Sequence, residues 1–368
     1  MSIFLLILII LSGCEPLATG FDDTEDAQYF EASVIHPPPD SISVIKVMTW
    51  NIRFGAARLP WFGDACGDRV ILTEDEVITA LQGIVDKINE VQPDILLLQE
   101  VDLNSKRSDY IDQLSWIMDH TYFNYAVYGS QWKAQFIPSD GLGRMNEGNV
   151  ILSRWKISNA VRKQLPLRKD QSSLVRYFYE RCCMVEGKIE IPEIIGNGLY
   201  VVNIHASAFA TDDTKEKHIE QFKSELDRLH GAGIIFLAGG DLNTLPPGSD
   251  TTDYCIQDKC EWESFHTEGD DPFHKEGSNY TPEKEWMVPL YSDYKSAVSL
   301  EKYQESQFRY FTHTTRPTHF WDRTLDYLFT NSSWVENSGE VRQEATALSD
   351  HAPVVARFVL PVKKTHKK

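Results

Sequence analysis

The sequence predicts one α/β domain over residues 41–362, in which two packed β-sheets are flanked by helices. Three observations predict it. Short apolar, β-branched runs outnumber the segments with helical spacing, the helical segments fall between the strands, and no internal repeat or second domain boundary is evident. Sheets and helices that alternate in this way bury their apolar faces against one another in layers. At 368 residues the chain is long enough to bury a large core.

The expected elements follow from two kinds of spacing. Runs rich in Val, Ile and Leu predict strands at 44–49, 94–99, 150–152, 184–191, 199–204, 234–238, 325–330 and 353–359. Apolar residues three or four positions apart predict helices at 76–90, 111–118 and 215–229.

The composition is that of a soluble globular protein with an unusual charge. Hydrophobic residues make up 42% of the chain, which is ordinary, but the net charge is −18. A field of that sign repels polyanions, so it counts against tight binding of nucleic acid. It does not count against a small phosphate substrate.

The N-terminus is typical of an export signal. Met1 to Ile10 is almost entirely apolar, yet the stretch before Cys14 is too short to span a bilayer as a helix. Its ending, Leu11-Ser12-Gly13-Cys14, resembles the lipobox of bacterial lipoproteins, in which the cysteine is lipidated. We therefore expect a signal peptide at 1–13, an acidic, proline-rich tether at 14–40, and a membrane anchor at Cys14 that faces the periplasm or the exterior. A plain secretory signal or a buried strand is the alternative, since the segment has no Lys or Arg.

The C-terminal tail and the other cysteines indicate little about function. Residues 363–368 form a basic tail. Cys255 and Cys260 bracket four residues of a polar loop and could close a small disulfide, whereas adjacent Cys182 and Cys183 should point to opposite faces of a strand. No Cys-x-x-Cys pair is present, which argues against a structural zinc site.

Seven short polar motifs each follow an apolar run. They are Thr49-Trp50-Asn51-Ile52-Arg53, Gln99-Glu100-Val101, Glu147-Gly148-Asn149, Asn203-Ile204-His205, Gly240-Asp241-Leu242-Asn243, Leu325-Asp326-Tyr327 and Ser349-Asp350-His351. Together they place carboxylates, amides and histidines at the ends of strands, where they can meet at one edge of a sandwich.

Two of these motifs indicate their chemistry directly. Glu100 ends an apolar strand, and a carboxylate at the rim of a core is costly unless it is paired or bound to a metal. Asp241 and Asn243 lie two residues apart, so on an extended chain they share a face, and Gly239-Gly240 lets the backbone approach closely. The structural alternatives are a salt bridge for Glu100 and a simple Asx-turn for Asp241.

From 47 to 358 the chain resembles the endonuclease/exonuclease/phosphatase superfamily, because all seven motifs occur in that family's order. The resemblance implies a four-layered α/β sandwich of two mainly antiparallel sheets, with the active site at one end. It also implies a magnesium-dependent hydrolase of phosphate esters, with Mn²⁺ as a substitute and Ca²⁺ in support.

The resemblance also implies roles for individual residues. Glu100 is the expected metal ligand, with Asn51 and Asp350 in support. The expected catalytic residues are Asp241, which orients or deprotonates water, Asn243, His205 with Glu147 as its partner, and His351 held by Asp326. Asn51 and Asn243 are expected to contact the phosphate. Arg181 lies at the start of a strand, where a phosphate contact and a surface salt bridge are the two alternatives.

The substrate stays open at this stage. Arg53 and His205 depart from the abasic-site endonucleases and match the deoxyribonuclease and phosphodiesterase branches. A nucleic acid, a lipid or glycolipid head group, and an inositol or sugar phosphate are the candidate substrates, and a non-catalytic binding lipoprotein is disfavoured because no key residue is lost. We expect a monomer whose specificity lies in the acidic loop at 246–293, which contains Trp262, His266 and His274.

Overall fold

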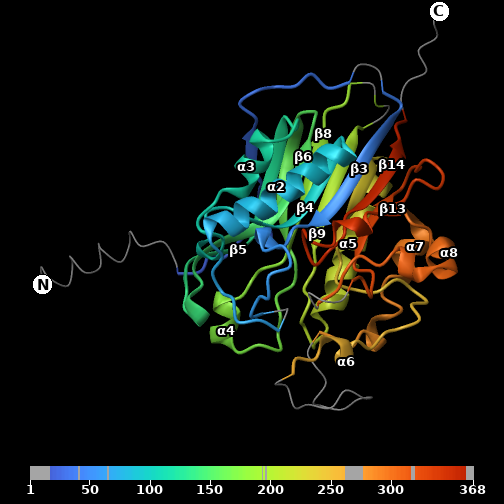
Figure 1. Ribbon diagram of the computed structural model, residues 1–368. Coiled ribbons are helices and arrows are strands. Elements are labelled where there is room, and N and C mark those ends of the chain that lie inside the picture. The colour runs from blue at the N-terminus through green and yellow to red at the C-terminus, as the bar shows by residue number, and fades with distance from the viewer. Residues whose placement is uncertain are drawn as a thin grey trace, which may run out of the picture.

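The computed structural model describes residues 17–39, 42–63, 66–192, 194, 197–261, 277–315 and 320–361. Two sheets of seven strands each pack face to face, and helices cover their outer faces (Figure 1). The α/β sandwich predicted from the sequence is therefore confirmed.

The order of strands differs between the sheets. The first sheet runs β1 (Thr24–Asp26), β7 (Ile157–Gln164), β8 (Cys183–Ile189), β9 (Leu199–His205), β10 (Ile235–Asp241), β12 (Asp326–Thr330) and β11 (Lys295–Ser296). The second runs β13 (Glu340–Val341), β14 (Val354–Val359), β3 (Val44–Asn51), β4 (Ile95–Asp102), β6 (Gly143–Ser153), β5 (Tyr125–Ile137) and β2 (Gln28–Glu31). Only the pairs β9–β10 and β3–β4 are parallel, so both sheets are mainly antiparallel.

The layers follow from the alternation of apolar residues along each strand. In β4, Ile95 and Leu97 face the other sheet, while Leu96 and Leu98 face the outer helices. The strand is apolar throughout because both of its faces are covered. The helices α2 (Glu74–Val91) and α3 (Gln113–Asp119) cover this sheet, and α5 (Thr214–Gly231) covers the other.

Helix α2 shows how the local sequence sets an element's ends. Thr73 and Glu76 form a capping box that satisfies free N–H groups of the first turn. The helix ends at Gln92, which has a left-handed backbone and is followed by Pro93. The expected helix at 111–118 begins later, because Asp112 caps its N-terminus.

The segment expected to be a tether is partly structured. Thr24–Asp26 pairs with β7 of one sheet, and Gln28–Glu31 pairs with β5 of the other. Ala27 lies between them, buried in the core between the sheets. The acidic residues misled the prediction because edge strands bury little side-chain surface and hold mainly by backbone hydrogen bonds.

The sequence left the disulfide pairing open, and the small Cys255–Cys260 bridge that it allowed does not form. Cys260 forms a disulfide with Cys66, 194 residues away in sequence, and Cys255 is buried elsewhere in the loop. This bridge ties the segment after β3 to the segment after α6 (Cys255–Asp258). Cys182 and Cys183 pack into different core clusters, as predicted.

The signal peptide, Cys14 and the basic tail lie outside the described residues. Within the part of the chain that is described, we find no helix of the length and apolarity needed to span a membrane.

The edge strands near the N-terminus should contribute to stability. A chain that starts at Ser33 loses both strand pairings, whereas a chain that starts at Leu17 keeps them. We expect the shorter chain to unfold with a free energy lower by at least about 2 kcal/mol, since each net backbone hydrogen bond contributes about 1 kcal/mol. Urea titration of the two chains measures this difference, and coincident unfolding curves would show that the strands contribute nothing.

Candidate active site

Polar side chains from both sheets meet at one end of the sandwich. The strand registers bring this about: His205 is level with Asp241 in the parallel pair β9–β10, and Asp241 is level with Asp326 on β12. In the other sheet, Asn51 is level with Gln99. The loops that follow these strands gather at the lower end of the sheets in Figure 1, with α4 (Ser173–Phe178) and α6.

These side chains line a cavity of about 360 Å³. Its wall contains three histidines, His205, His313 and His351, and several carboxylates. Much of the remaining wall is aromatic and includes Phe54, Trp61, Phe62, Trp132, Tyr179, Phe209 and Tyr280. Such a mixture of apolar walls and a few convergent polar groups is typical of a small-molecule site.

Two glycines allow the strands to approach closely beneath the site. A Cβ atom on Gly240, whose φ is +136°, would lie 1.9 Å from the carbonyl oxygen of Ile204. One on Gly239 would lie 2.0 Å from the carbonyl oxygen of Tyr327. Both positions therefore exclude any larger residue, as the sequence indicated.

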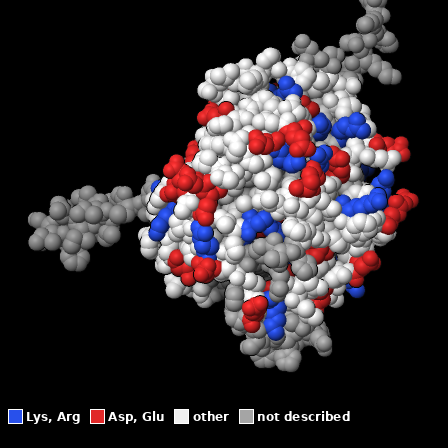
Figure 2. Space-filling model, viewed as in Figure 1, with Lys and Arg blue, Asp and Glu red and all other residues white. Residues whose placement is uncertain are grey.

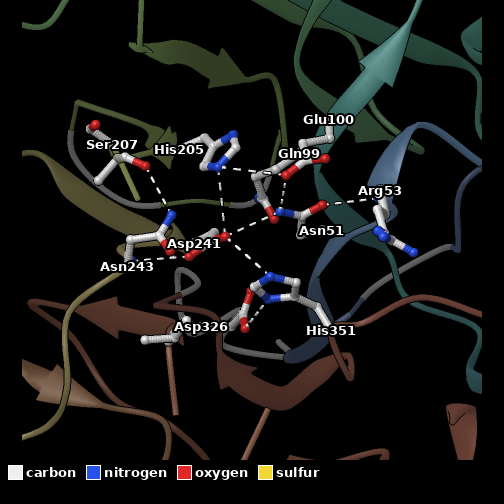
Figure 3. A network of polar contacts seen from close by, with 12 residues as sticks. Asn51, Arg53, Gln99, Glu100, His205, Ser207, Asp241, Asn243, Asp326 and His351 are labelled. Atoms are coloured by element: carbon white, nitrogen blue, oxygen red, sulfur yellow. Dashed lines mark hydrogen bonds and ion pairs between the residues drawn. The ribbon is translucent and has the colours of Figure 1, made fainter. Parts of the chain in front are cut away.

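Asp241 lies at the centre of the site (Figure 3). Its Oδ2 accepts a hydrogen bond from Asn51 Nδ2 at 3.1 Å and lies 3.6 Å from His205 Nε2 and 3.5 Å from His351 Nε2. Its Oδ1 accepts the backbone N–H of Asn243 at 3.0 Å. The carboxylate is 1% exposed, so these neighbours replace its solvation.

His351 is paired with Asp326 beside the Asp241 carboxylate. Nδ1 of His351 lies 2.8 Å from Asp326 Oδ2. Burial alone would lower the pKa of His351, but the carboxylates of Asp326 and Asp241 outweigh it and raise that pKa to about 10. Burial raises the pKa of Asp326 to about 6, against the effect of His351. The predicted pairing of these residues is therefore present in the structure.

Glu100 lies on a β-bulge. The pairing of β4 with β6 shifts register between Leu98 and Val101, and Glu100 has a φ of +54°. The bulge turns its carboxylate toward the cavity, where Oε1 accepts from Asn51 Nδ2 at 2.8 Å. Burial, and then the charges of Glu147 and Asp350, raise the pKa of Glu100 to about 8. This carboxylate therefore lies where a cation would relieve repulsion among acids.

Buried amides support the strands at this bulge. Asn203 Nδ2 donates to the carbonyls of Leu98 and Val150, at 2.8 Å each, across the space between the sheets. Gln99 Nε2 donates to Asn203 Oδ1 at 2.6 Å. The Asn203-Ile204-His205 motif therefore contributes a structural amide as well as a histidine.

Asn51 is oriented as a donor toward the site. Its Oδ1 accepts the backbone N–H of Arg53 at 2.9 Å, which leaves Nδ2 facing Glu100 and Asp241. A metal ligand would have to offer Oδ1, so this orientation suits a contact to phosphate and not the expected ligation of a metal.

Asp350 is paired with an arginine. Its Oδ2 lies 3.1 Å from Arg53 Nε, and both side chains are nearly buried. The carboxylate also lines the cavity, next to His313.

His313 was not singled out from the sequence, yet its ring packs against that of His351 with centroids 4.4 Å apart. Burial and the neighbouring His351 lower the pKa of His313 well below its ordinary value.

Glu147 belongs to a buried network that the sequence did not reveal. Arg107 donates to Glu147 Oε2 at 2.7 Å and pairs with Asp102. Gln131 Nε2 donates to Glu147 Oε1 at 2.8 Å and lies 2.9 Å from His205 Nδ1. The expected partnership of Glu147 with His205 is therefore indirect, because Gln131 lies between them.

Arg181 is not brought to the site. Its guanidinium donates to the carbonyls of Tyr177 and Tyr179 and is absent from the described cavity wall. Glu180, the preceding residue, lines the cavity instead. Burial and the charge of Glu147 raise the pKa of Glu180 to about 7. The candidate phosphate contact therefore fails, because adjacent residues of an extended chain point to opposite sides.

Comparisons with known proteins agree with this arrangement. A family model described as "Endonuclease/Exonuclease/phosphatase family" matches residues 48–351. Among solved structures, an endonuclease/exonuclease/phosphatase from Beutenbergia cavernae is similar, at 18% identity and a TM-score of 0.53, over 87% of this chain and 72% of that one. The 3′ phosphatase NExo from Neisseria, solved with a product DNA hairpin, is similar at 17% identity and a TM-score of 0.50, over 85% and 99%. At such identities the likeness shows the fold alone. No curated protein matches the chain in sequence.

Behind the site, His218 supports the segment that follows His205. Its Nδ1 accepts the backbone N–H of Ser207 at 3.1 Å, and its Nε2 lies 2.8 Å from the carbonyl of Pro166. Both contacts require a neutral ring with the proton on Nε2. Burial lowers the pKa of His218 to about 4.

The neutral His218 should make stability depend on pH. In the unfolded chain His218 binds a proton below about pH 6.5, whereas in the folded chain it does so only near pH 4. As the pH falls through this window, the free energy of unfolding therefore decreases by up to about 3 kcal/mol. We expect His218→Gln to flatten this loss in urea titrations at pH 7, 5.5 and 4.5. His230→Gln, at an exposed position of α5, is the matched control. An unchanged pH profile in His218→Gln would refute the assignment.

Proposed function

The chain belongs to the endonuclease/exonuclease/phosphatase family, and on that premise we propose that it hydrolyses phosphate esters by attack of water at the site around Asp241. One observation supports this most directly: a buried carboxylate is held by Asn51 and lies between two imidazoles. This arrangement suits a water nucleophile that must be oriented and must lose a proton.

In the proposed reaction Asp241 accepts the proton of the attacking water. The hydrogen bonds from Asn51 and from the backbone of Asn243 fix the direction of its carboxylate. His351, kept protonated by Asp326, donates to a phosphoryl oxygen or to the leaving oxygen. His205 faces the same carboxylate from the other side and stabilises the charge that develops on phosphorus.

The residues present fit a divalent cation. Glu100, Asp241 and Asp350 all line the cavity, and oxygen ligands are those that Mg²⁺ and Mn²⁺ prefer. Burial, and after it the negative charges of Glu147 and Asp350, raise the pKa of Glu100, and a bound cation would offset both effects. Two trios have ligand atoms within 4.8 Å of one another, namely Asp241, Asp326 and His351, and His313, Asp350 and His351. We propose Glu100 as the main ligand of a magnesium ion, which when bound would polarise a phosphoryl oxygen.

The cavity favours a small ester with an aromatic or apolar group. Its volume of about 360 Å³ suits a small molecule, and seven Phe, Trp and Tyr side chains belong to its described wall. In the described part of that wall, Arg107 and Arg323 are both ion-paired with buried carboxylates. On the face seen in Figure 2, acidic and basic groups are interspersed without a continuous basic surface. We therefore propose a phosphodiester of limited size ahead of a long nucleic acid or an inositol polyphosphate.

A hydrolysis panel tests this proposal. Bis-p-nitrophenyl phosphate, p-nitrophenyl phosphate, plasmid DNA, RNA, sphingomyelin and inositol phosphates would be incubated with the protein and magnesium. We expect the aryl diester to be cleaved most efficiently, and we expect His351→Ala and Asp241→Asn each to lower the rate by about 100-fold or more.

Two controls make the panel decisive. His230→Ala removes an exposed histidine far from the site and should leave the rate unchanged. A chelator should abolish hydrolysis, and added Mg²⁺ or Mn²⁺ should restore it. Hydrolysis that persists after chelation, or that is unaffected by His351→Ala, would contradict the mechanism.

We also propose that the protein is exported and anchored in a membrane through Cys14. The support is the sequence alone, an apolar leader that ends in Leu11-Ser12-Gly13-Cys14. Expression in a bacterial host with a radiolabelled fatty acid should label the wild type and not the Cys14→Ser variant. Equal labelling of the two proteins would rule out the anchor.

A further inference from the structure

The two ring nitrogens of His205 have different surroundings. Nε2 faces the cavity, 3.6 Å from Asp241 Oδ2 and 3.8 Å from Glu100 Oε1. Nδ1 faces inward and lies 2.9 Å from Nε2 of Gln131, a fully buried residue on β5. Which nitrogen of His205 holds the proton therefore depends on which end of the Gln131 amide faces it.

A chain of hydrogen bonds fixes the orientation of the Gln131 amide. The backbone carbonyl of Cys183 can only accept, so the Asn149 group 3.0 Å from it is the amide Nδ2. That same Nδ2 donates to Gln131 Oε1 at 3.3 Å. Gln131 therefore presents its Nε2 in the other direction, where one N–H donates to Glu147 Oε1 at 2.8 Å.

The second N–H of Gln131 is directed at His205 Nδ1, which lies 2.9 Å from Gln131 Nε2, whereas Glu180 Oε2 lies farther from the same nitrogen, at 3.5 Å. Because an amide N–H can only donate, Nδ1 of His205 must accept, and the ring holds its single proton on Nε2. A proton on Nδ1 would set two N–H groups against each other at 2.9 Å in a buried contact. The contact therefore selects one neutral tautomer of His205.

We propose that Gln131 is a positioning residue that holds His205 as an Nε2–H donor, so that His205 binds a phosphoryl oxygen and does not serve as a general base. This inference rests on the proposed phosphate-ester hydrolysis, and it assigns His205 to binding a phosphoryl oxygen.

The other histidine of the site has the opposite arrangement. Nδ1 of His351 lies 2.8 Å from the carboxylate of Asp326. This carboxylate can accept a hydrogen bond from an N–H at Nδ1, whereas an amide donor requires that Nδ1 accept. The two imidazoles on either side of Asp241 are thus set for different tasks by what lies behind them.

Nuclear magnetic resonance reads the tautomer directly. In protein labelled with ¹⁵N-histidine, long-range ¹H–¹⁵N correlation spectra at neutral pH distinguish the protonated from the unprotonated ring nitrogen. His205→Asn identifies the His205 signals by their loss. We expect wild-type His205 to be protonated on Nε2 alone, and a proton on Nδ1 would overturn the proposal.

Substitutions of Gln131 test its control over that state. Gln131→Glu replaces the donor by an acceptor, and we expect the proton of His205 to move to, or to be shared by, Nδ1. Gln131→Met removes the donor, so the ring should populate both tautomers, and hydrolysis should fall by about 10- to 100-fold. Gln135→Met, at an exposed position of the same strand, is the matched control and should change neither signal nor rate. An unchanged His205 spectrum in both Gln131 variants would refute the positioning role.

The role of His205 itself has a separate kinetic signature. If the ring only donates, His205→Gln keeps an N–H donor and should retain at least about tenfold more activity than His205→Ala. Equal loss of activity in the two variants would contradict the donor role. If the wild type cleaves no ester while His205 shows a lone Nε2 proton, then the proposed function fails and the positioning by Gln131 stands.

Discussion

One side-chain amide joins the two sheets at the site. Nδ2 of Asn51 donates to Glu100, which belongs to the same sheet, and to Asp241, which belongs to the other. Two carboxylates so close together repel each other, and burial increases that repulsion. A neutral donor between them offsets part of the cost without adding the fixed positive charge that would compete with a metal ion. The imidazoles of His205 and His351 face the same Asp241 carboxylate that this amide holds.

The strain at Glu100 is compensated below the site. The bulge that turns this carboxylate outward places a non-glycine residue at positive φ and interrupts the ladder between β4 and β6. Asn203, from the opposite sheet, donates to the two backbone carbonyls beside the interruption. Buried carbonyls without such a donor would each cost about 1–3 kcal/mol. The same contacts hold β9 in the register that brings His205 level with Asp241.

The sequence predicted the strands β3, β4, β6, β8, β9, β10, β12 and β14, because apolar runs report burial on both faces of a strand. It also predicted the residues that end these strands, including the pairing of Asp326 with His351. It missed β1, β2, β5, β7, β11 and β13, which lack such apolar runs. It failed where a residue's role depends on contacts distant in sequence. Gln131 lies mid-strand in a segment with no motif, and Cys66 meets Cys260 only through the folding of two loops. Arg181 was a candidate for a phosphate contact, yet the structure turns Glu180 to the cavity in its place.

These failures share a physical cause. A motif specifies which chemical groups reach the rim of the sandwich, but the protonation state of each group depends on its buried neighbours. Asp326 and Gln131 each contact the Nδ1 atom of a histidine, yet an acceptor and a donor impose opposite states on that nitrogen. A histidine identified from the sequence alone therefore has an unknown protonation state. In this protein the resemblance to a family identifies the groups that meet at Asp241, and the hydrogen bonds behind His205 and His351 determine what each can do there.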